Sequence, residues 1–542
     1  MTHDLDGNVI SKTNKQGQTF SFNYDGNNLL ISKNFPGDSV VYNYDRDHLL
    51  ASVTDADSEV RMEYDVFKRP IAEFSNHYNG HIEYAYNLRG EKVNTRLFLD
   101  GADAIDIKRY FDPNGNLTKA EGYFLGKKID FERWIEGTSR PSGIRHPNGA
   151  VTNISYDKNS RPESAFTVFG GQGMLLTYRY TANGNISTVY DEFNNLGKTY
   201  RYKYDELSRL IAEDTLEAKS YELDPVGNNL SRGGQFNELN QLLEDNNFTY
   251  QYSLNGNLTT KTSKADGKKF QYTWSAENKL ATVVISKAGN VLTKTLNYTY
   301  DGLGRRITRS VQDHVNASKS YERKFIYDGE HILAILDGSN NFIAGYLYGP
   351  GVDEPMGMVT DYNQDGEQDV LTFVKDRQNS VRLILNEKSE VIQEASYSAY
   401  GETQILERGH IKYKVENSFY YTSRELESET GDYYYRARYY SPVQGRFLSE
   451  DPIGFLSGDA NFYRYVKNQP INMRDPNGKD AEDVLDDGTC IALRWVNPEA
   501  ICGDWDDNLT DIMCTGFPNA DSCKEDEEEA PKPAPPLACT EI

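Results

Sequence analysis

The fold of this 542-residue chain is indicated most clearly by one stretch, Thr19-Phe20-Ser21-Phe22-Asn23-Tyr24-Asp25-Gly26-Asn27. Aromatic and polar residues alternate over its first six positions, which predicts a β-strand with Phe20, Phe22 and Tyr24 on one face. The last three residues have the composition of a tight turn, because Gly and Asn adopt a positive φ at low cost. The stretch therefore predicts one strand of a hairpin and the turn that follows it.

The Tyr-Asp pair recurs along the first two thirds of the chain, and its first three copies are 20 residues apart. A period of this size is typical of repeated supersecondary units. We expect each copy to close a strand and to open a turn, and Asn-Gly or Asp-Gly pairs to mark tight hairpin turns, which need a positive φ. The chain is therefore predicted to be all-β, a long series of antiparallel hairpins. The eight Tyr-Asp copies are Tyr24-Asp25, Tyr44-Asp45, Tyr64-Asp65, Tyr156-Asp157, Tyr190-Asp191, Tyr204-Asp205, Tyr300-Asp301 and Tyr327-Asp328. The turn pairs are Asn114-Gly115, Asn183-Gly184, Asn255-Gly256 and Asp301-Gly302.

Composition supports strands and turns. The chain has 39 tyrosines, 23 phenylalanines and 43 glycines, which favour sheets joined by turns. Only 38% of its residues are hydrophobic, and the mean hydropathy is −0.70, so many strands must have one polar face. A repetitive sheet that winds around something, or a stacked solenoid, fits these values better than one compact core.

Charge and hydropathy limit the partners. A net charge of −24 argues against nucleic acid or an anionic membrane as a direct partner of the whole surface. No apolar run is long enough for a membrane span, and the N-terminal residues have neither the basic nor the apolar part of a conventional signal peptide. We expect a protein that is secreted, or placed on the cell surface, by a specialised system.

The last segment, residues 479–542, differs from the rest. It holds 17 acidic and 4 basic residues and all five cysteines, without a Cys-x-x-Cys pair or a histidine. These spacings favour two disulfides and one odd thiol, formed outside the cytoplasm, over a metal site. Because common nuclease and cysteine-hydrolase chemistry needs a histidine, we do not expect the tail to be an enzyme. Its acidic and proline-rich end is typical of a disordered linker.

From residue 416 the sequence resembles the core domain of Rhs (rearrangement hotspot) proteins. The residues that carry this resemblance are Phe419-Tyr420, Glu429-Thr430-Gly431, Tyr434-Tyr435-Arg436-Ala437-Arg438-Tyr439-Tyr440, Gly445-Arg446-Phe447, Asp451-Pro452-Ile453-Gly454, Asn461-Phe462-Tyr463-Arg464-Tyr465, Asn468-Gln469-Pro470 and Asp475-Pro476-Asn477-Gly478. Upstream, Asn237–Leu242, Tyr300–Arg306 and Tyr348–Pro355 are similar to the YD repeats of the same family. The resemblance covers residues 1–478.

The resemblance implies a hollow β-shell, or cocoon, whose core domain spirals inward as a plug and which encloses the polypeptide that follows. It divides the chain into a YD-repeat shell (residues 1–330), continuing shell strands (331–415), the core (416–478) and the variable acidic tail (479–542). In bacterial relatives the enclosed polypeptide is a toxin. The implied partners are the chain's own tail as cargo, a secretion system or toxin complex, and an immunity protein.

The resemblance also implies self-cleavage by an aspartic-type protease in the core. The acid pair would be Asp451 and Asp475, with Arg438 as the neighbouring cation, because two carboxylates in one site cannot both ionise. The expected scissile bond joins Lys479 to Asp480. The family usually has Leu or Met at the position of Lys479, and Asp451 and Asp475 can also be explained as turn residues before proline.

A separate segment, residues 361–369, has the spacing of a calcium loop. Asp361, Asn363, Asp365, Glu367 and Asp369 supply oxygen ligands, and a glycine occupies its sixth position. The twelfth position is a threonine and not the glutamate of an EF-hand, so a shorter calcium loop at a β-turn is expected. The alternative is an exposed polar turn. The sequence indicates no other cofactor.

Two classes of function remain. The first is a toxin-delivery shell that releases its variable C-terminal segment. The second is a structural or adhesive YD-repeat protein of the cell surface that frees no cargo. Self-cleavage distinguishes them, since only the first class needs it.

Overall fold

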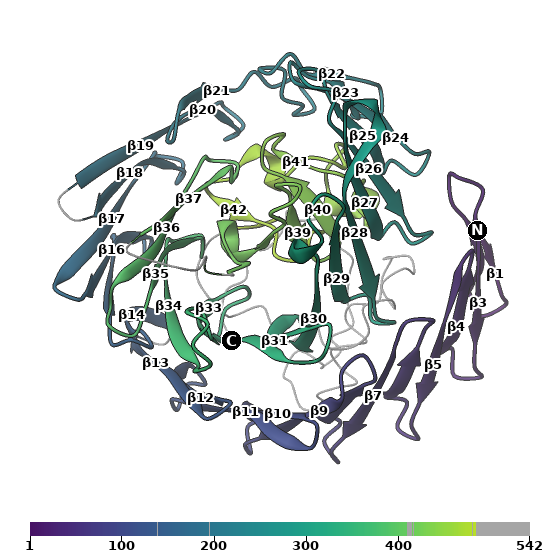
Figure 1. The fold of residues 1–542 in the computed structure, drawn as a ribbon, viewed down its shortest axis with the longest axis horizontal. Coiled ribbons are helices and arrows are strands. Elements are labelled where there is room, and N and C mark those ends of the chain that lie inside the picture. The colour runs from purple at the N-terminus through teal and green to yellow at the C-terminus, as the bar shows by residue number, and fades with distance from the viewer. Residues whose placement is uncertain (138, 194–195, 409–414, 416, 480, 484–542) are drawn as a thin grey trace, which may run out of the picture. The chain divides into compact units, whose positions relative to one another are not determined.

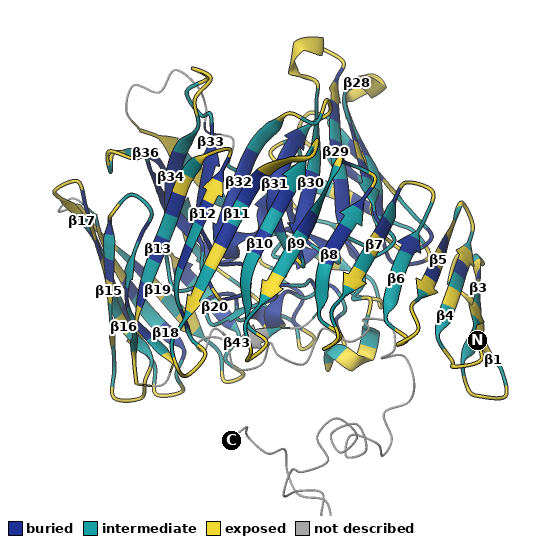
Figure 2. Ribbon diagram, turned by 90° about the horizontal axis from the view of Figure 1, so that it is seen from below, coloured by how far each residue is buried: buried dark blue, intermediate teal, exposed yellow. Residues whose placement is uncertain are grey.

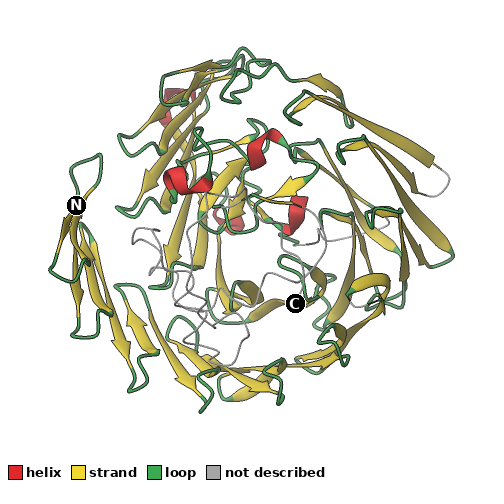
Figure 3. Cartoon of the chain, turned by 180° about the vertical axis from the view of Figure 1, so that it is seen from behind, coloured by secondary structure: helices red, strands yellow, loops and turns green. Residues whose placement is uncertain are grey.

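The structure is a computed structural model that describes residues 1–137, 139–193, 196–408, 415, 417–479 and 481–483. The chain divides into two units, Met1–Gly488 and Thr489–Ile542, and all described residues lie in the first. The described part consists of antiparallel strands joined by turns, with only short 3-10 segments, as Figure 3 shows. The predicted all-β class is confirmed. Among these residues, no helix has the length and apolar character needed to cross a lipid bilayer.

The first sheet has 21 strands, each paired with its neighbours in the sequence. Its strands are β1 (Thr2–His3), β2 (Val9–Thr13), β3 (Thr19–Tyr24), β4 (Leu30–Phe35), β5 (Asp38–Tyr44), β6 (Leu50–Thr54), β7 (Glu59–Tyr64), β8 (Pro70–Ser75), β9 (Gly80–Tyr86), β10 (Lys92–Leu99), β11 (Ala102–Phe111), β12 (Leu117–Phe124), β13 (Lys127–Glu136), β14 (Arg140–Arg145), β15 (Val151–Tyr156), β16 (Pro162–Phe169), β17 (Gln172–Tyr180), β18 (Ile186–Phe193), β19 (Leu196–Tyr204), β20 (Leu210–Asp214) and β21 (Ala218–Ser220).

The second sheet has 16 strands with the same sequential pairing. Its strands are β22 (Gln235–Phe236), β23 (Leu242–Glu244), β24 (Phe248–Tyr252), β25 (Leu258–Ser263), β26 (Lys269–Trp274), β27 (Leu280–Lys287), β28 (Val291–Tyr300), β29 (Arg306–Asp313), β30 (Tyr321–Asp328), β31 (His331–Asp337), β32 (Phe342–Tyr348), β33 (Pro355–Thr360), β34 (Asp369–Lys375), β35 (Val381–Leu385), β36 (Val391–Tyr397) and β37 (Thr403–Glu407).

The core segment adds two small sheets and most of the 3-10 segments. The four-stranded sheet contains β38 (Glu425–Leu426), β39 (Tyr433–Tyr435), β40 (Arg438–Ser441) and β41 (Arg446–Phe447), and the two-stranded sheet contains β42 (Met473–Arg474) and β43 (Glu482–Asp483). The 3-10 segments are η1 (Ala288–Asn290), η2 (Ala317–Lys319), η3 (Tyr421–Ser423), η4 (Gly454–Ser457) and η5 (Val466–Asn468).

The hydrogen bonds of one repeat explain the Tyr-Asp pair. The carboxylate oxygen Oδ1 of Asp25 accepts from the backbone N–H groups of Asn27 and Leu29 and so satisfies the donors of the turn. Tyr44 ends β5, and its hydroxyl donates to the carbonyl of Leu30 at the start of β4, 3.0 Å away. Tyr64 makes the equivalent bond to Leu50 at 2.9 Å. The aspartate therefore fixes the turn, and the tyrosine ties each hairpin to the previous one.

The regular turns that follow the Tyr-Asp pairs are three-residue loops. The N–H of Asn28 donates to the Asp25 carbonyl, and the Asp25 N–H donates to the carbonyl of Leu29, which makes a three-residue loop. The residue with positive φ is the third after the aspartate, Asn28 at 62°, and not Gly26. The glycine of Asn114-Gly115 occupies this same third position, whereas in Asp301-Gly302 it is Gly304 that has the positive φ. Gly184 and Gly256 also have a positive φ, so the expected turn with a left-handed glycine is confirmed at the three Asn-Gly pairs.

Two Tyr-Asp copies do not open such a turn. Tyr190-Asp191 lies inside β18, where Asp191 forms a 2.5 Å ion pair with Arg382 of β35. Tyr327-Asp328 ends β30, and buried Asp328 pairs with Lys92 and Arg109 of the first sheet. In both copies the aspartate joins the two large sheets, a role that depends on residues distant in sequence.

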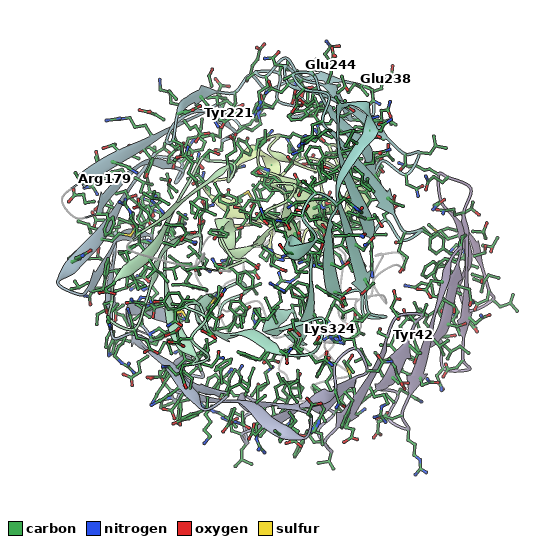
Figure 4. The ribbon with its side chains drawn as sticks, in the orientation of Figure 1. Tyr42, Arg179, Tyr221, Glu238, Glu244 and Lys324 are labelled. Atoms are coloured by element: carbon green, nitrogen blue, oxygen red, sulfur yellow. The ribbon has the colours of Figure 1, made fainter. Side chains whose placement is uncertain are left out.

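The second sheet packs against the inner face of the first. Strands β12 and β13 contact β32, β33 and β34, and one apolar cluster contains Phe124 and Phe131 of the first sheet together with Met356 and Val359 of the second. Figure 1 shows β30–β36 running inside β9–β17, and Figure 2 shows buried positions concentrated where these strands overlap. Figure 4 shows Tyr42 on the inner side of β5, Tyr221, directly after β21, on the inner side of the wall, and Arg179 of β17 on the outer side.

The core segment lies within the curve of both sheets (Figure 1). Tyr433, Tyr440 and Tyr465 are almost fully buried and share a cluster with residues of β17–β20 and β34–β36. The large sheets are interrupted at residues 221–234, between β21 and β22, and the second sheet continues without interruption past residue 330. The core is thus held by both sheets, and its last described turn precedes the acidic tail.

Candidate active site

Arg438, Asp451 and Asp475, the three predicted site residues of the core, meet in the structure. One guanidinium nitrogen of Arg438 lies 3.1 Å from Asp451 Oδ2 and 3.2 Å from Asp475 Oδ2. All three side chains are at least nine-tenths buried. The Arg438 guanidinium also lies over the Phe447 ring, 3.6 Å from its centre, and this contact fixes its plane. The geometry is that of two carboxylates on one buried cation.

Each of the two carboxylates also accepts a backbone hydrogen bond with its other oxygen. Asp451 Oδ1 accepts from the N–H of Ile453, and Asp475 Oδ1 accepts from the N–H of Lys479 at 3.0 Å. The Oδ1 atoms therefore cap the two Asp-Pro turns, while the Oδ2 atoms face Arg438. Turn formation and a paired-acid site, which the sequence presented as alternatives, are compatible here because they use different oxygens.

Burial raises the pKa of Asp475 to about 6, since the charged form loses its water. Arg438 and the Lys479 N–H lower the pKa of this carboxyl, and the negative charge of Asp451 raises it further. The protonated form of Asp475 is therefore accessible near neutral pH. A pair with one protonated and one ionised member can donate a proton at one atom and accept one at another.

The segment before the predicted scissile bond is tightly held. Arg438 Nε donates to the Gly478 carbonyl at 2.5 Å, and the Ala437 N–H donates to the carbonyl of Asn477. Gly478 has a φ of 72°, and a Cβ at this position would lie 2.3 Å from the Tyr435 carbonyl oxygen, so only glycine fits. Lys479 is partly exposed, and Asp480 lies outside the described residues, as do all five cysteines.

The predicted calcium loop forms a compact turn between β33 and β34. Asp361 accepts from the N–H groups of Asp365 and Gly366, and Asp365 accepts from that of Glu367. Burial, with Glu387 and Asp365 nearby, raises the pKa of Asp369 to about 6. In the described part of the chain no three His, Cys, Asp or Glu side chains are grouped as metal ligands. These carboxylates would have to turn away from the backbone to bind a cation.

Sequence pattern did not connect Asp353 with the core. It lies in the loop between β32 and β33 and pairs with Arg424 at 2.8 Å and with Arg436 at 2.7 Å. Arg436 in turn donates to the carbonyl of Pro476, in the turn that contains Asp475. The quoted stretch Tyr348–Pro355 contains Asp353, but only a long-range contact reveals what it binds.

A second buried network joins the core to the second sheet. Arg306 of β29 pairs with Glu425 at 2.6 Å and with Glu427 at 2.5 Å, and Arg309 pairs with Glu427 at 3.0 Å. The Arg306 guanidinium lies over the Tyr434 ring, 4.1 Å from its centre. Because every charge has a partner, this buried network can exist without a large desolvation penalty.

Comparison with known proteins finds one matching family model and several similar curated proteins. Residues 148–471 match the family model described as Teneurin YD-shell. The tRNA3(Ser)-specific nuclease WapA of Bacillus spizizenii is 28% identical over 357 residues, which cover 61% of this chain and 14% of the relative. The double-stranded DNA deaminase toxin A of Burkholderia cenocepacia is 27% identical over 455 residues, covering 77% of this chain and 30% of the relative.

Toxin subunit YenC2 of Yersinia entomophaga is 30% identical over 237 residues, or 41% of this chain and 23% of the relative. The chain therefore spans less than a third of the length of each of these three relatives. The crystal structure of TcdB2-TccC3-Cdc42 superposes with a TM-score of 0.40 at 16% identity, covering 88% of this chain and 31% of that one.

Proposed function

The chain belongs to the teneurin YD-shell family and is a YD-repeat protein of the Rhs type, and from that premise we propose that it forms the shell of a toxin-delivery protein. In this proposal the shell encloses the polypeptide that follows residue 478 and presents it to a target cell. The observation that carries it is the position of the core, which is held inside both large sheets and ends at the composition change to the acidic tail.

The relatives support this proposal by what their names state. They include tRNA nucleases, a double-stranded DNA deaminase toxin and toxin subunits, so different activities occur in proteins that share this region. A common shell with a variable activity elsewhere in the chain explains that pattern. On this proposal the partners are a toxin complex or secretion system and an immunity protein, and the protein acts outside the cell that makes it.

We propose that the core cleaves the bond between Lys479 and Asp480. Asp475, whose pKa is about 6, would protonate the leaving nitrogen, and Asp451 would take a proton from the attacking water. Arg438 would hold the pair in place and stabilise the ionised member. The released tail would stay inside the shell until delivery.

The test uses the purified full chain. On denaturing electrophoresis we expect a band smaller than the intact 61.6 kDa protein, together with a fragment that begins at Asp480. On native size exclusion both pieces should elute together, and the enclosed piece should resist an added protease. A single intact species after long incubation, with a tail that protease removes at once, contradicts the delivery shell and favours a cell-surface adhesive protein.

A further inference from the structure

Asp353 lies where the wall, formed by the two large sheets, meets the turn at residues 475–479, which we call the cleavage turn. It belongs to the loop between β32 and β33 of the second sheet, is 4% exposed, and accepts hydrogen bonds from Arg424 and Arg436 of the core. Burial raises the pKa of Asp353, but Arg424 and Arg436 lower it more strongly, to about 2. The carboxylate is therefore charged at any working pH, and its partners hold it in a fixed position.

Arg436 joins Asp353 to the cleavage turn, because it bonds to both. One of its nitrogens donates to the Pro476 carbonyl, and another lies 2.7 Å from Asp353 Oδ1. The next two residues hold the same turn, because the Ala437 N–H donates to the Asn477 carbonyl and Arg438 Nε to that of Gly478. Three consecutive carbonyls before the predicted scissile bond are thus bound by three consecutive core residues.

Glu354, the residue after Asp353, connects the same loop to the first sheet. Glu354 is buried, accepts from the N–H of Gly351, and lies 3.7 Å from a guanidinium nitrogen of Arg133 in β13. Two adjacent acids therefore face opposite ways, one to the core and one to the first sheet. A continuous path of charged contacts joins both sheets to the cleavage turn.

We propose that Asp353 is a positioning residue for self-cleavage, which through Arg436 holds the Pro476–Lys479 segment against Asp475 only when the wall is assembled. The proposal rests on the self-cleavage proposed above. It follows that folding precedes cleavage, because the core cannot cut before β32 and β33 have folded and joined the first sheet. The tail would then be freed only inside a finished shell.

The decisive variant is Asp353→Asn, which removes the charge that anchors Arg436. We expect self-cleavage to slow by up to about 100-fold, because a small misplacement of reacting groups has a large effect on rate. Asp353→Glu keeps the charge and should restore part of the rate. The matched control is Asp191→Asn, since Asp191 is also buried and paired with an arginine but touches no residue of the turn. It should lower the melting temperature and leave the cleavage rate near that of the unmutated chain.

Hydrogen exchange separates this proposal from the cleavage proposal. The amide protons of Ala437 and Lys479 bond within the held turn, so Asp353→Asn should speed their exchange while Asp191→Asn should not. Those rates can be measured in a chain made inactive by Asp451→Asn. If no chain cleaves but the two amides respond to Asp353→Asn, the cleavage proposal fails and the positioning contact stands.

Equal exchange and equal cleavage in the Asp353→Asn and Asp191→Asn chains would overturn the inference. Should Asp353→Asn not fold, Arg436→Lys provides the second variant, because lysine keeps the charge but cannot reach both Asp353 and the Pro476 carbonyl with a fixed fork. It should slow cleavage at temperatures where the protein remains folded. Unchanged cleavage in a folded Arg436→Lys chain also overturns the inference.

Discussion

The carboxylates of Asp451 and Asp475 meet at one nitrogen of Arg438, 3.1 and 3.2 Å from it, although the two residues are held by different turns. Each turn places its aspartate before a proline and uses Oδ1 as a cap, which leaves Oδ2 for the cation. This arrangement makes the site testable one group at a time, because an asparagine keeps the cap and removes the acid.

Asp451→Asn and Asp475→Asn should each leave the chain whole, since the proposed reaction needs both an acid and a base. The amide oxygen of asparagine can still accept from the turn N–H, so folding should be largely kept. Intact mass after incubation gives the result. Asp459→Asn is the control, because Asp459 also pairs with an arginine of the core, Arg464, at 2.7 Å but lies outside the acid pair. Cleavage in either acid variant would remove these aspartates from the chemistry.

The rate of self-cleavage should depend on pH through Asp475. Its pKa is raised to about 6 by burial, so the protonated form dominates below this value. We expect the rate to fall by about tenfold per pH unit above pH 6, as the acid is lost. The raised pKa also means that the folded state binds a proton that the unfolded state lacks between about pH 4 and 6. In that window the contribution of Asp475 to stability falls as pH rises. A rate that increases steadily up to pH 9 would rule out Asp475 as the acid.

Calcium should raise the melting temperature if the loop at residues 361–369 binds it. A ligand present at 100 times its dissociation constant stabilises the folded state by about 2.7 kcal/mol. Asp365→Ala should remove the response. Asp337→Ala is the control, because Asp337 caps a similar turn through the N–H groups of Ser339 and Asn341. Identical melting curves in calcium and in chelator would reduce the loop to a polar turn.

Lys68→Gly should stabilise the β7–β8 hairpin. Lys68 has a φ of 64°, a left-handed conformation that costs a non-glycine residue about 1 kcal/mol. The control is Lys158→Gly, at the first position after Asp157 in an equivalent turn, where the left-handed residue is Ser160. There glycine only adds freedom to the unfolded chain and should destabilise by up to about 1 kcal/mol. Hydrogen exchange of the two hairpins measures both effects.

Local pattern predicted strands well because alternation and turn residues act over a few positions. The strand Thr19–Tyr24 and the turn after it follow from their own side chains. The glycine of each Asn-Gly pair has the expected positive φ, whereas in the first turn the left-handed residue is Asn28, whose N–H bonds to the Asp25 carbonyl.

Long-range partners could not be predicted in the same way. Tyr190-Asp191 has the same two residues as a turn-opening pair but lies inside β18, where its carboxylate pairs with Arg382 of the other sheet. Asp353 is 83 residues before Arg436, and no local rule connects them. The acid pair was predicted from the resemblance alone. Only the three-dimensional arrangement shows that Oδ1 of each aspartate accepts from a turn N–H while Oδ2 faces Arg438.

Pairing between chain neighbours has a mechanical consequence. Within each of the two large sheets, every described strand pairs with the strands before and after it in the sequence, and the Tyr-Asp tyrosine of a regular turn reaches back one hairpin. Under tension applied at an end, such a wall can peel away hairpin by hairpin, each step breaking a small set of bonds in succession. We therefore expect force applied at one end to unfold these sheets in a series of small steps and not in one event.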